Sequence, residues 1–155
     1  MQLKVKIEDK GVRELLGNLI DNLEDPKPAL RAIGEVIRTS VERNFASQGR
    51  PDPWEPSRRV KESGGETLTD TARLRRSFTV EVGDESVAVG TNVIYAAIHH
   101  FGGMIRPVHA KALFWGGASN PVKSVKLPAR PFLMVQKEDW SEIRETLGDF
   151  LTRRS

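Results

Sequence analysis

The chain has 155 residues, a formal net charge of +3 at neutral pH and no cysteine. A chain of this length can form one hydrophobic core, so we expect a single domain over residues 1–155. The lack of cysteine excludes a disulfide framework, thiolate metal sites and cysteine nucleophiles. No apolar run approaches the length of a membrane-spanning helix, and the alternating start of the chain is unlike a signal peptide.

The positive charge is concentrated in one part of the chain. Residues 86–137 contain no Asp or Glu, and they hold six Lys and Arg together with all three histidines. This stretch therefore has a net charge of +6, whereas the rest, with 18 basic and 21 acidic residues, has a net charge of −3. A local positive field indicates a polyanionic partner or an acidic protein surface.

The first third of the chain predicts a strand followed by two helices. Residues 3–7 alternate between apolar and charged side chains, as in a strand with one exposed face. Apolar residues recur at helical spacing over residues 12–23 and again over residues 30–45. Pro26 suits the first turn of the second helix, and Ser47–Gly49 would end it.

A long loop and a β-hairpin come next. Residues 50–67 carry three prolines and two glycines with few apolar residues, so we expect a long loop, which in a small domain is usually functional or disordered. Residues 68–77 predict a short, partly helical segment with Thr69 or Asp70 as its cap. Alternating apolar residues on either side of Gly83–Ser86 predict a hairpin.

The central stretch, Val89–Gly103, predicts the end of a strand, a tight turn, a short helix and a glycine stop. Gly90 would end the strand, Thr91 or Asn92 would cap the helix, and Gly102 would end it. Apolar residues at helical spacing predict that one face of this helix packs into the core. The expected core consists of Leu74, Phe78, Ile94, Ile98 and Phe132, beside Leu16, Ile33 and Ile143 of the longer helices.

A second hairpin, here called the arm (residues 104–127), follows the central helix. Its strand-like halves, 106–115 and 122–127, are joined by a glycine-containing tip. Residues 132–135 predict a further short strand. A last helix begins at Glu138, with acidic residues in its first turn as the helix dipole favours. Together the elements predict an α+β fold, with a mostly antiparallel sheet of about four to five strands, helices packed on one face and the arm protruding.

Patterns that could support catalysis or metal binding are weak. The adjacent His99 and His100 point about 100° apart on a helix and cannot bind one metal as an i, i+4 pair would. We expect one of them to be packed or hydrogen-bonded and the other solvated. A triad of Asp70, His99 and Ser77 is conceivable, but the Gly-x-Ser-x-Gly elbow of hydrolases is missing. We therefore expect no enzyme, no metal and no cofactor.

Several side chains are candidates for contacts with partners or with other subunits. The arm combines basic and aromatic residues, which suits a protein contact or a nucleic acid, although an ordinary exposed hairpin is the simpler alternative. The basic run Arg73–Arg76 is either a solvated face or a set of carboxylate partners at a subunit contact. Trp54 is either a core plug for the long loop or an interface anchor. The candidate contacts are Trp54, Arg73, Arg76, Arg106, Lys111, Trp115, Lys123 and Lys126.

Three stretches in this order resemble a known family. They are Leu68–Ser77, Gly90–Gly103 and Pro128–Leu133, and Trp54 with Pro56 precedes them. With these residues the chain resembles the phage virion morphogenesis family, the tail-completion proteins of Mu-like and related tailed phages. The resemblance covers roughly Ala46 to the end. It departs from the family pattern at Ala72, where glycine usually follows the threonine.

The resemblance implies a structural virion protein that completes or terminates the tail, or joins it to the head. Relatives in this functional class assemble as rings, commonly sixfold, on the end of the tail tube. We therefore expect a homo-oligomeric ring, other neck or tail-tube proteins as partners, and no membrane partner. Non-specific contact with DNA in the ring lumen is a further option for the basic arm.

The resemblance also implies a location. We expect the protein in the virion, at the head–tail junction or the tail end, and in the host cytoplasm during assembly. The alternative function is a stand-alone nucleic-acid-binding module, whose monomer would bind DNA with a steep dependence on salt.

Overall fold

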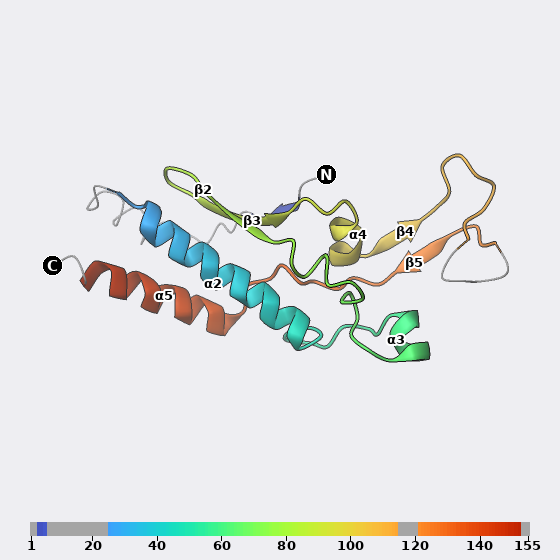
Figure 1. The fold of residues 1–155 in the computed structure, drawn as a ribbon, viewed down its shortest axis with the longest axis horizontal. Coiled ribbons are helices and arrows are strands. Elements are labelled where there is room, and N and C mark those ends of the chain that lie inside the picture. Colours follow the sequence, from blue (N-terminus) through green and yellow to red (C-terminus); the bar gives the residue numbers. More distant parts are fainter. Residues whose placement is uncertain (1–2, 6–24, 115–120, 153–155) are drawn as a thin grey trace.

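The computed structural model describes residues 3–5, 25–114 and 121–152. Two long helices lie side by side, a small sheet covers one of them, and a two-stranded ribbon extends from the opposite end of an elongated molecule (Figure 1). The elements are β1 (Leu3–Val5), α2 (Lys27–Ala46), α3 (Arg58–Ser63), β2 (Thr79–Val82), β3 (Val87–Thr91), α4 (Ala96–Phe101), β4 (Gly103–Ile105), β5 (Val125–Leu127) and α5 (Lys137–Thr152).

Helix α2 is the element on which the others pack. Its apolar stripe is buried as predicted, and Pro26 immediately precedes its first turn. The sheet formed by β2 and β3 covers one side of α2, and α5 packs along another. Gly34 permits this close packing, because a β-carbon there would collide with Val80 and Val87. The helix ends at Ala46 with Ser47 as its C-cap, which agrees with the stop predicted at Ser47–Gly49.

The strands form two separate antiparallel sheets. In the first, the order is β1-β3-β2, and Val80 faces Val89 in the predicted hairpin. In the second, β4 pairs only with β5 within the described chain. The α+β class is confirmed, but the single sheet of four to five strands is wrong. The reason is local: after β3 the chain enters α4 and then turns at Gly102, so β4 leaves in a new direction instead of extending the first sheet.

The core is built around four aromatic rings. Phe45 packs against Trp54, with ring centroids 5.4 Å apart, and against Phe132 at 5.5 Å. Phe132 in turn meets Phe78 edge to face at 5.6 Å. Leu74 completes the part of the predicted core that is confirmed, together with the helix residues Ile33 and Ile143. The predicted Leu16 lies outside the described residues.

The prediction for the central helix is wrong in its orientation. Helix α4 begins only at Ala96, and the side chains that face the core are those of Ala96 and His100, one turn apart. Ile94 precedes the helix and is 80% exposed, and Ile98 is only half-buried. The predicted apolar face therefore points largely away from the core.

Smaller differences concern capping and local structure. The predicted loop 50–67 contains the short helix α3, which buries none of its residues and so leaves no apolar pattern in the sequence. The short strand predicted over residues 132–135 is absent, and the chain bends at Leu133. Neither Thr69 nor Asp70 acts as a cap; Thr71 Oγ1 instead accepts a hydrogen bond from the backbone of Arg73 at 3.4 Å. The predicted helix over residues 12–23 lies outside the described residues.

Candidate assembly interface

The arm is a hairpin with short regular strands. Met104 faces Lys126 in the ladder of β4 and β5. Farther out, Leu113 and Val122 form an isolated bridge, with reciprocal backbone hydrogen bonds of 2.8 and 2.9 Å. Between these two points the first half of the arm is irregular, so the predicted strand over 106–115 is mostly absent. The ribbon nevertheless carries the arm well away from the body (Figure 1).

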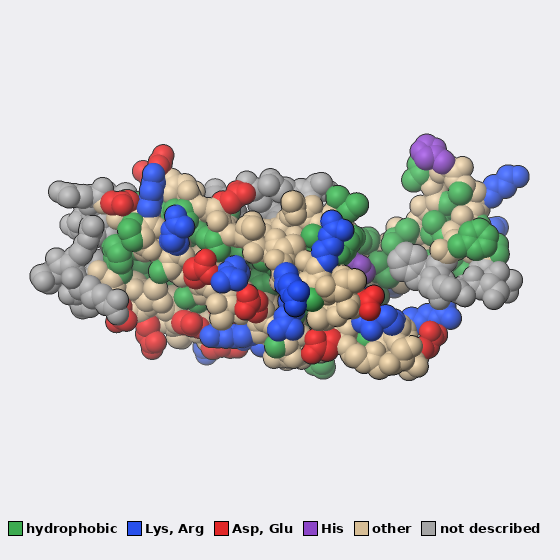
Figure 2. Space-filling view, in the orientation of Figure 1, with side chains coloured by type: hydrophobic (Ala, Val, Ile, Leu, Met, Phe, Trp, Pro, Cys, Tyr) green, Lys and Arg blue, Asp and Glu red, His purple; other side chains and the backbone are tan. Residues whose placement is uncertain are grey.

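The basic side chains of the arm are exposed and unpaired. Arg106, Lys111, Lys123 and Lys126 all lie on the surface, and none makes an ion pair in the described part of the chain. On the body, by contrast, many basic side chains meet an acid. Figure 2 shows red acidic side chains over the body but none on the arm. The arm therefore presents a positive charge that no acidic side chain among the described residues neutralises.

Exposed apolar side chains gather at the same end of the molecule. Phe101 is 65% exposed and Met104 is 49% exposed, and Figure 2 shows apolar side chains where the arm leaves the body. Exposed apolar surface of this kind marks sites of interaction. We call the set at α4 and β4 the arm-base patch; it consists of Ile94, Tyr95, Phe101 and Met104. Farther along the arm, Val108 and Phe114 are also exposed.

A close-packed joint fixes the arm to the body. Gly102 has φ +70°, and a β-carbon there would lie 2.6 Å from the backbone nitrogen of Ala129, which favours glycine on both counts. The buried Arg130 donates from Nε to the carbonyl of Glu55 at 2.9 Å and from its backbone to the carbonyl of His99 at 2.9 Å. The residues that carry the family resemblance thus connect β5, α4 and the long loop.

The two histidines of α4 both belong to this joint. The His100 ring lies 4.9 Å from that of Phe132, and its Nδ1 accepts a long hydrogen bond of 3.5 Å from the backbone of Leu133. His99 is half-buried, and its Nδ1 is buried without a hydrogen-bond partner among the residues that the structure describes. Burial lowers the pKa of both histidines, and the nearby Arg130 lowers the pKa of His99 further. His100 is packed as predicted, but His99 is not the solvated residue we expected.

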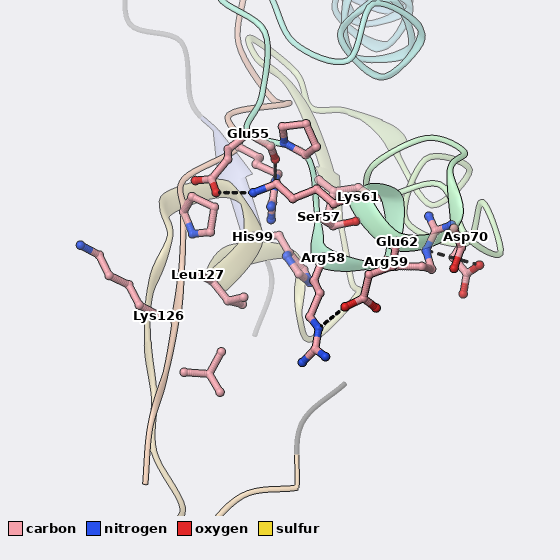
Figure 3. Close-up of a pocket in the computed structure, with 16 residues that line it drawn as sticks. Glu55, Ser57, Arg58, Arg59, Lys61, Glu62, Asp70, His99, Lys126 and Leu127 are labelled. Carbon is pink, nitrogen blue, oxygen red and sulfur yellow. Dashed lines mark hydrogen bonds and ion pairs between the residues drawn. The ribbon is translucent and has the colours of Figure 1, made fainter. Parts of the chain in front are cut away.

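An open groove of about 820 Å³ lies between α3 and the base of β5 (Figure 3). Its charged residues largely pair with one another: Lys61 meets Glu55 at 3.2 Å, and Arg58 meets Glu62 at 2.6 Å. Leu127 lines the same groove. Lys126 also lines the groove without an ion pair in the described chain, but because most of the charges there are paired and mixed in sign, the groove itself favours no particular charged ligand.

The conceivable triad is not assembled. Asp70 is exposed and lies 3.8 Å from Arg59, and Ser77 Oγ donates to the carbonyl of Leu74 at 2.7 Å. No hydrogen bond joins either residue to His99 among the described residues. The described ranges also contain no group of three His, Asp or Glu side chains that could hold a metal ion.

The remaining candidate contacts are divided between core and surface. Trp54 is 7% exposed, and its Nε1 donates to the carbonyl of Pro131 at 3.2 Å, so it packs as the core plug of the long loop. Arg73 and Arg76 are exposed, and Arg76 lines a shallow hollow beside α2. Trp115 lies outside the described residues. The sequence did not single out Arg130 as a functional residue, although its place in the family stretch Pro128–Leu133 could have indicated one.

The described residues form an α+β body with an arm. Among these residues, unpaired cations and exposed apolar groups lie together at the end of the molecule that carries the arm. Surfaces of this kind are typical of proteins that assemble with other subunits. The chain belongs to the phage virion morphogenesis family, whose model matches residues 7–152. The resemblance found in the sequence is thereby confirmed, and it extends further towards the N-terminus than predicted.

One relative matches over almost its whole length. The chain is 32% identical over 149 residues to Mu-like prophage FluMu G protein 2 of Haemophilus influenzae, covering 94% of this chain and 95% of the relative. No solved structure gives a significant match. Among the described residues, no helix is both long enough and apolar enough to cross a membrane. The protein is thus a phage morphogenesis protein, similar to one of a Mu-like prophage.

Proposed function

We propose that the protein completes or terminates the phage tail and helps to join it to the head, as one subunit of a ring at the head–tail interface. The observation that carries the proposal is the arm, because it combines exposed apolar residues with four cations that have no partner within the described chain. In a member of a virion morphogenesis family, such a surface is best explained as a contact in an assembly.

The distribution of charge favours a closed ring over a two-fold dimer. Contacts between unlike surfaces of identical subunits form rings when the rotation closes. An acid-free, basic arm at one end of an elongated subunit needs an acidic surface as its partner. The family resemblance is the reason for proposing a sixfold ring, and neighbouring neck or tail-tube proteins would contact its two faces.

The alternative is a stand-alone nucleic-acid-binding module. It is supported by the same basic residues, which could meet phosphates through a diffuse, salt-screened attraction. The exposed Phe114 and the arm-base patch favour a protein contact, because a fixed apolar surface suits a partner with a fixed shape. In a ring, the arm could still line the lumen through which DNA passes.

The test is complementation of a phage that lacks the gene. Wild-type protein should restore infectious particles, and the variant with Lys111, Lys123 and Lys126 all changed to Glu should not, although it folds because these residues are exposed. Without the protein we expect tails with abnormal ends and unjoined heads. Normal yields of infectious particles with the variant, or well-formed joined virions without the gene, would contradict the proposal.

A further inference from the structure

We infer that the arm of one copy docks on the outer face of helix α5 of a second copy, in a head-to-tail contact between unlike surfaces. This inference rests on the proposed ring and specifies which two surfaces meet in it. The arm and α5 lie towards opposite ends of the long axis of the molecule, so one copy can offer the arm while it receives another arm at its other end (Figure 1).

The receiving surface is a line of acidic residues on α5. Glu138, Glu142, Glu145 and Asp149 are separated by four, three and four positions, the spacing that places side chains on one face of a helix. Glu138, Glu145 and Asp149 are exposed, and Glu142 is half-buried. With a rise of about 1.5 Å per residue, the line extends over about 17 Å. We call it the acidic stripe.

The stripe keeps a net negative charge within its own subunit. Arg50 lies 3.1 Å from Glu138, and Arg43 lies 2.8 Å from Glu142. The same two arginines also form ion pairs with the buried Asp139, Arg50 at 3.3 Å and Arg43 at 3.5 Å. Leaving Asp149 aside, two cations therefore face four carboxylates, those of Glu138, Asp139, Glu142 and Glu145. Glu145 makes no ion pair in the described part of the chain.

The sign of the charges excludes the simplest alternative geometry. If two arms met about a two-fold axis, residues such as Lys111 and Lys123 would face their own copies, with no acid in either arm. Like charges placed together at an interface are unfavourable. An arm on an acidic stripe instead sets unpaired cations against a surplus of carboxylates, and the exposed Phe114 would exclude water from the contact.

The absence of cysteine makes the contact testable by disulfide trapping. Lys123→Cys and Glu145→Cys are prepared as separate variants, one of them isotope-labelled, then mixed at high concentration and mildly oxidised. Intact mass spectrometry should find the mixed dimer in clear excess over either homodimer. A single chain with both changes should form a series of covalent multimers that reductant dissolves.

Asp84→Cys is the matched control, because Asp84 is an exposed acid on the β2–β3 turn, outside the stripe. We expect little cross-linking between it and Lys123→Cys. Predominant homodimers of Lys123→Cys would overturn the inference in favour of an arm-to-arm contact. Equal trapping by Asp84→Cys, or no trapping although a thiol reagent labels both cysteines, would also overturn it.

Reversal of charge provides an independent measurement on the same proteins. Lys123→Glu or Glu145→Lys alone should weaken association by about tenfold or more, and the two changes together should restore most of it. Failure of the double variant to recover would contradict the pairing. If virions contain the ring but these contacts are absent, only this inference fails. If virions lack the ring, the proposed function fails as well.

Discussion

Asp139 joins the two long helices through a buried polar network. Its Oδ2 accepts hydrogen bonds from the hydroxyl of Ser40 on α2 and from the backbone of Gln136 at 2.7 Å, and Arg50 lies 3.3 Å away. The bond to Gln136, just before α5, is one half of a capping box. Asn44 Oδ1 accepts a hydrogen bond of 2.8 Å from Nε of the same Arg50. A single carboxylate thus caps α5 and ties it to α2.

Asp139→Ala should therefore be strongly destabilising. Loss of one partner leaves buried polar and charged groups uncompensated, which typically costs about 3–5 kcal/mol. The measurement is the free energy of unfolding in urea. The control is Glu138→Ala at the neighbouring, exposed position, where we expect a loss of less than about 1 kcal/mol. Similar small losses for both variants would show that the network does not hold the helices together.

Ala72 adopts a backbone conformation that alanine disfavours, with φ +56°. This is the position at which the sequence departs from the glycine of the family pattern. The left-handed conformation costs a residue other than glycine about 1–2 kcal/mol, and the greater freedom of glycine in the unfolded chain offsets about 0.4–1 kcal/mol.

Ala72→Gly should accordingly stabilise the protein by up to about 1 kcal/mol. Ala32→Gly, inside α2, is the control and should destabilise it by about 0.5–1 kcal/mol. Thermal unfolding of both variants gives the comparison. If both lose the same amount of stability, the backbone at Ala72 is not strained.

The histidines of α4 predict a dependence of stability on pH. The pKa of both His99 and His100 lies below the ordinary value of 6.5 in the folded protein because burial disfavours the charged ring. Below about pH 6.5 the unfolded chain therefore binds more protons than the folded one, so stability is full above this pH and falls as the pH is lowered through it.

Urea unfolding at pH 7.5 and pH 5.5 measures this effect. The wild type should unfold at a lower urea concentration at pH 5.5, and His100→Phe should show a smaller difference between the two conditions. His109→Gln, a change at an exposed position on the arm, should behave as the wild type does. An unchanged wild-type midpoint at the two pH values would contradict the assignment of buried, neutral rings.

Among the elements, the sequence predicts those whose periodicity is strong and local. Helix α2 and the β2–β3 hairpin follow from apolar spacing alone. The separation of the arm from the first sheet does not, because it depends on contacts between distant segments, such as Gly102 with Ala129. Helix α3 is missed for a different reason: it buries nothing, so no apolar period marks it.

The candidate site was only partly predictable for a related reason. The unpaired cations of the arm follow from the absence of nearby acids in the sequence. The arm-base patch does not, because apolar residues at helical spacing predict a buried face whether the partner lies in the same chain or in another. Ile94 and Phe101 fit the core pattern in the sequence but lie on the surface of the described chain.

Variants of the arm-base patch test whether its apolar residues pack in the core of their own chain or against another chain. Ile94→Asp combined with Phe101→Ser should leave the free energy of unfolding within about 0.5 kcal/mol, as for surface positions in general. The same variant should fail to complement a phage lacking the gene. As a control, Phe78→Ala in the core should cost about 3–5 kcal/mol. A comparable loss in the patch variant would place these residues in the core after all.

At the scale of the whole molecule, two surfaces of opposite charge lie towards opposite ends of the long axis. The arm carries unpaired cations at one end of the long axis, and the acidic stripe lies towards the other (Figure 1). Identical subunits with two unlike, complementary ends form rings or open filaments. The chain belongs to the phage virion morphogenesis family, and a ring would have a role in the assembly of a virion.

The most direct test of the proposed function is a cryo-electron microscopy map of the intact virion with this protein located in it. We expect a closed ring of touching copies, commonly sixfold, at the tail end or the head–tail junction, with the arm of each copy against its neighbour. A map in which the copies are isolated from one another, or virions that lack the protein, would contradict it.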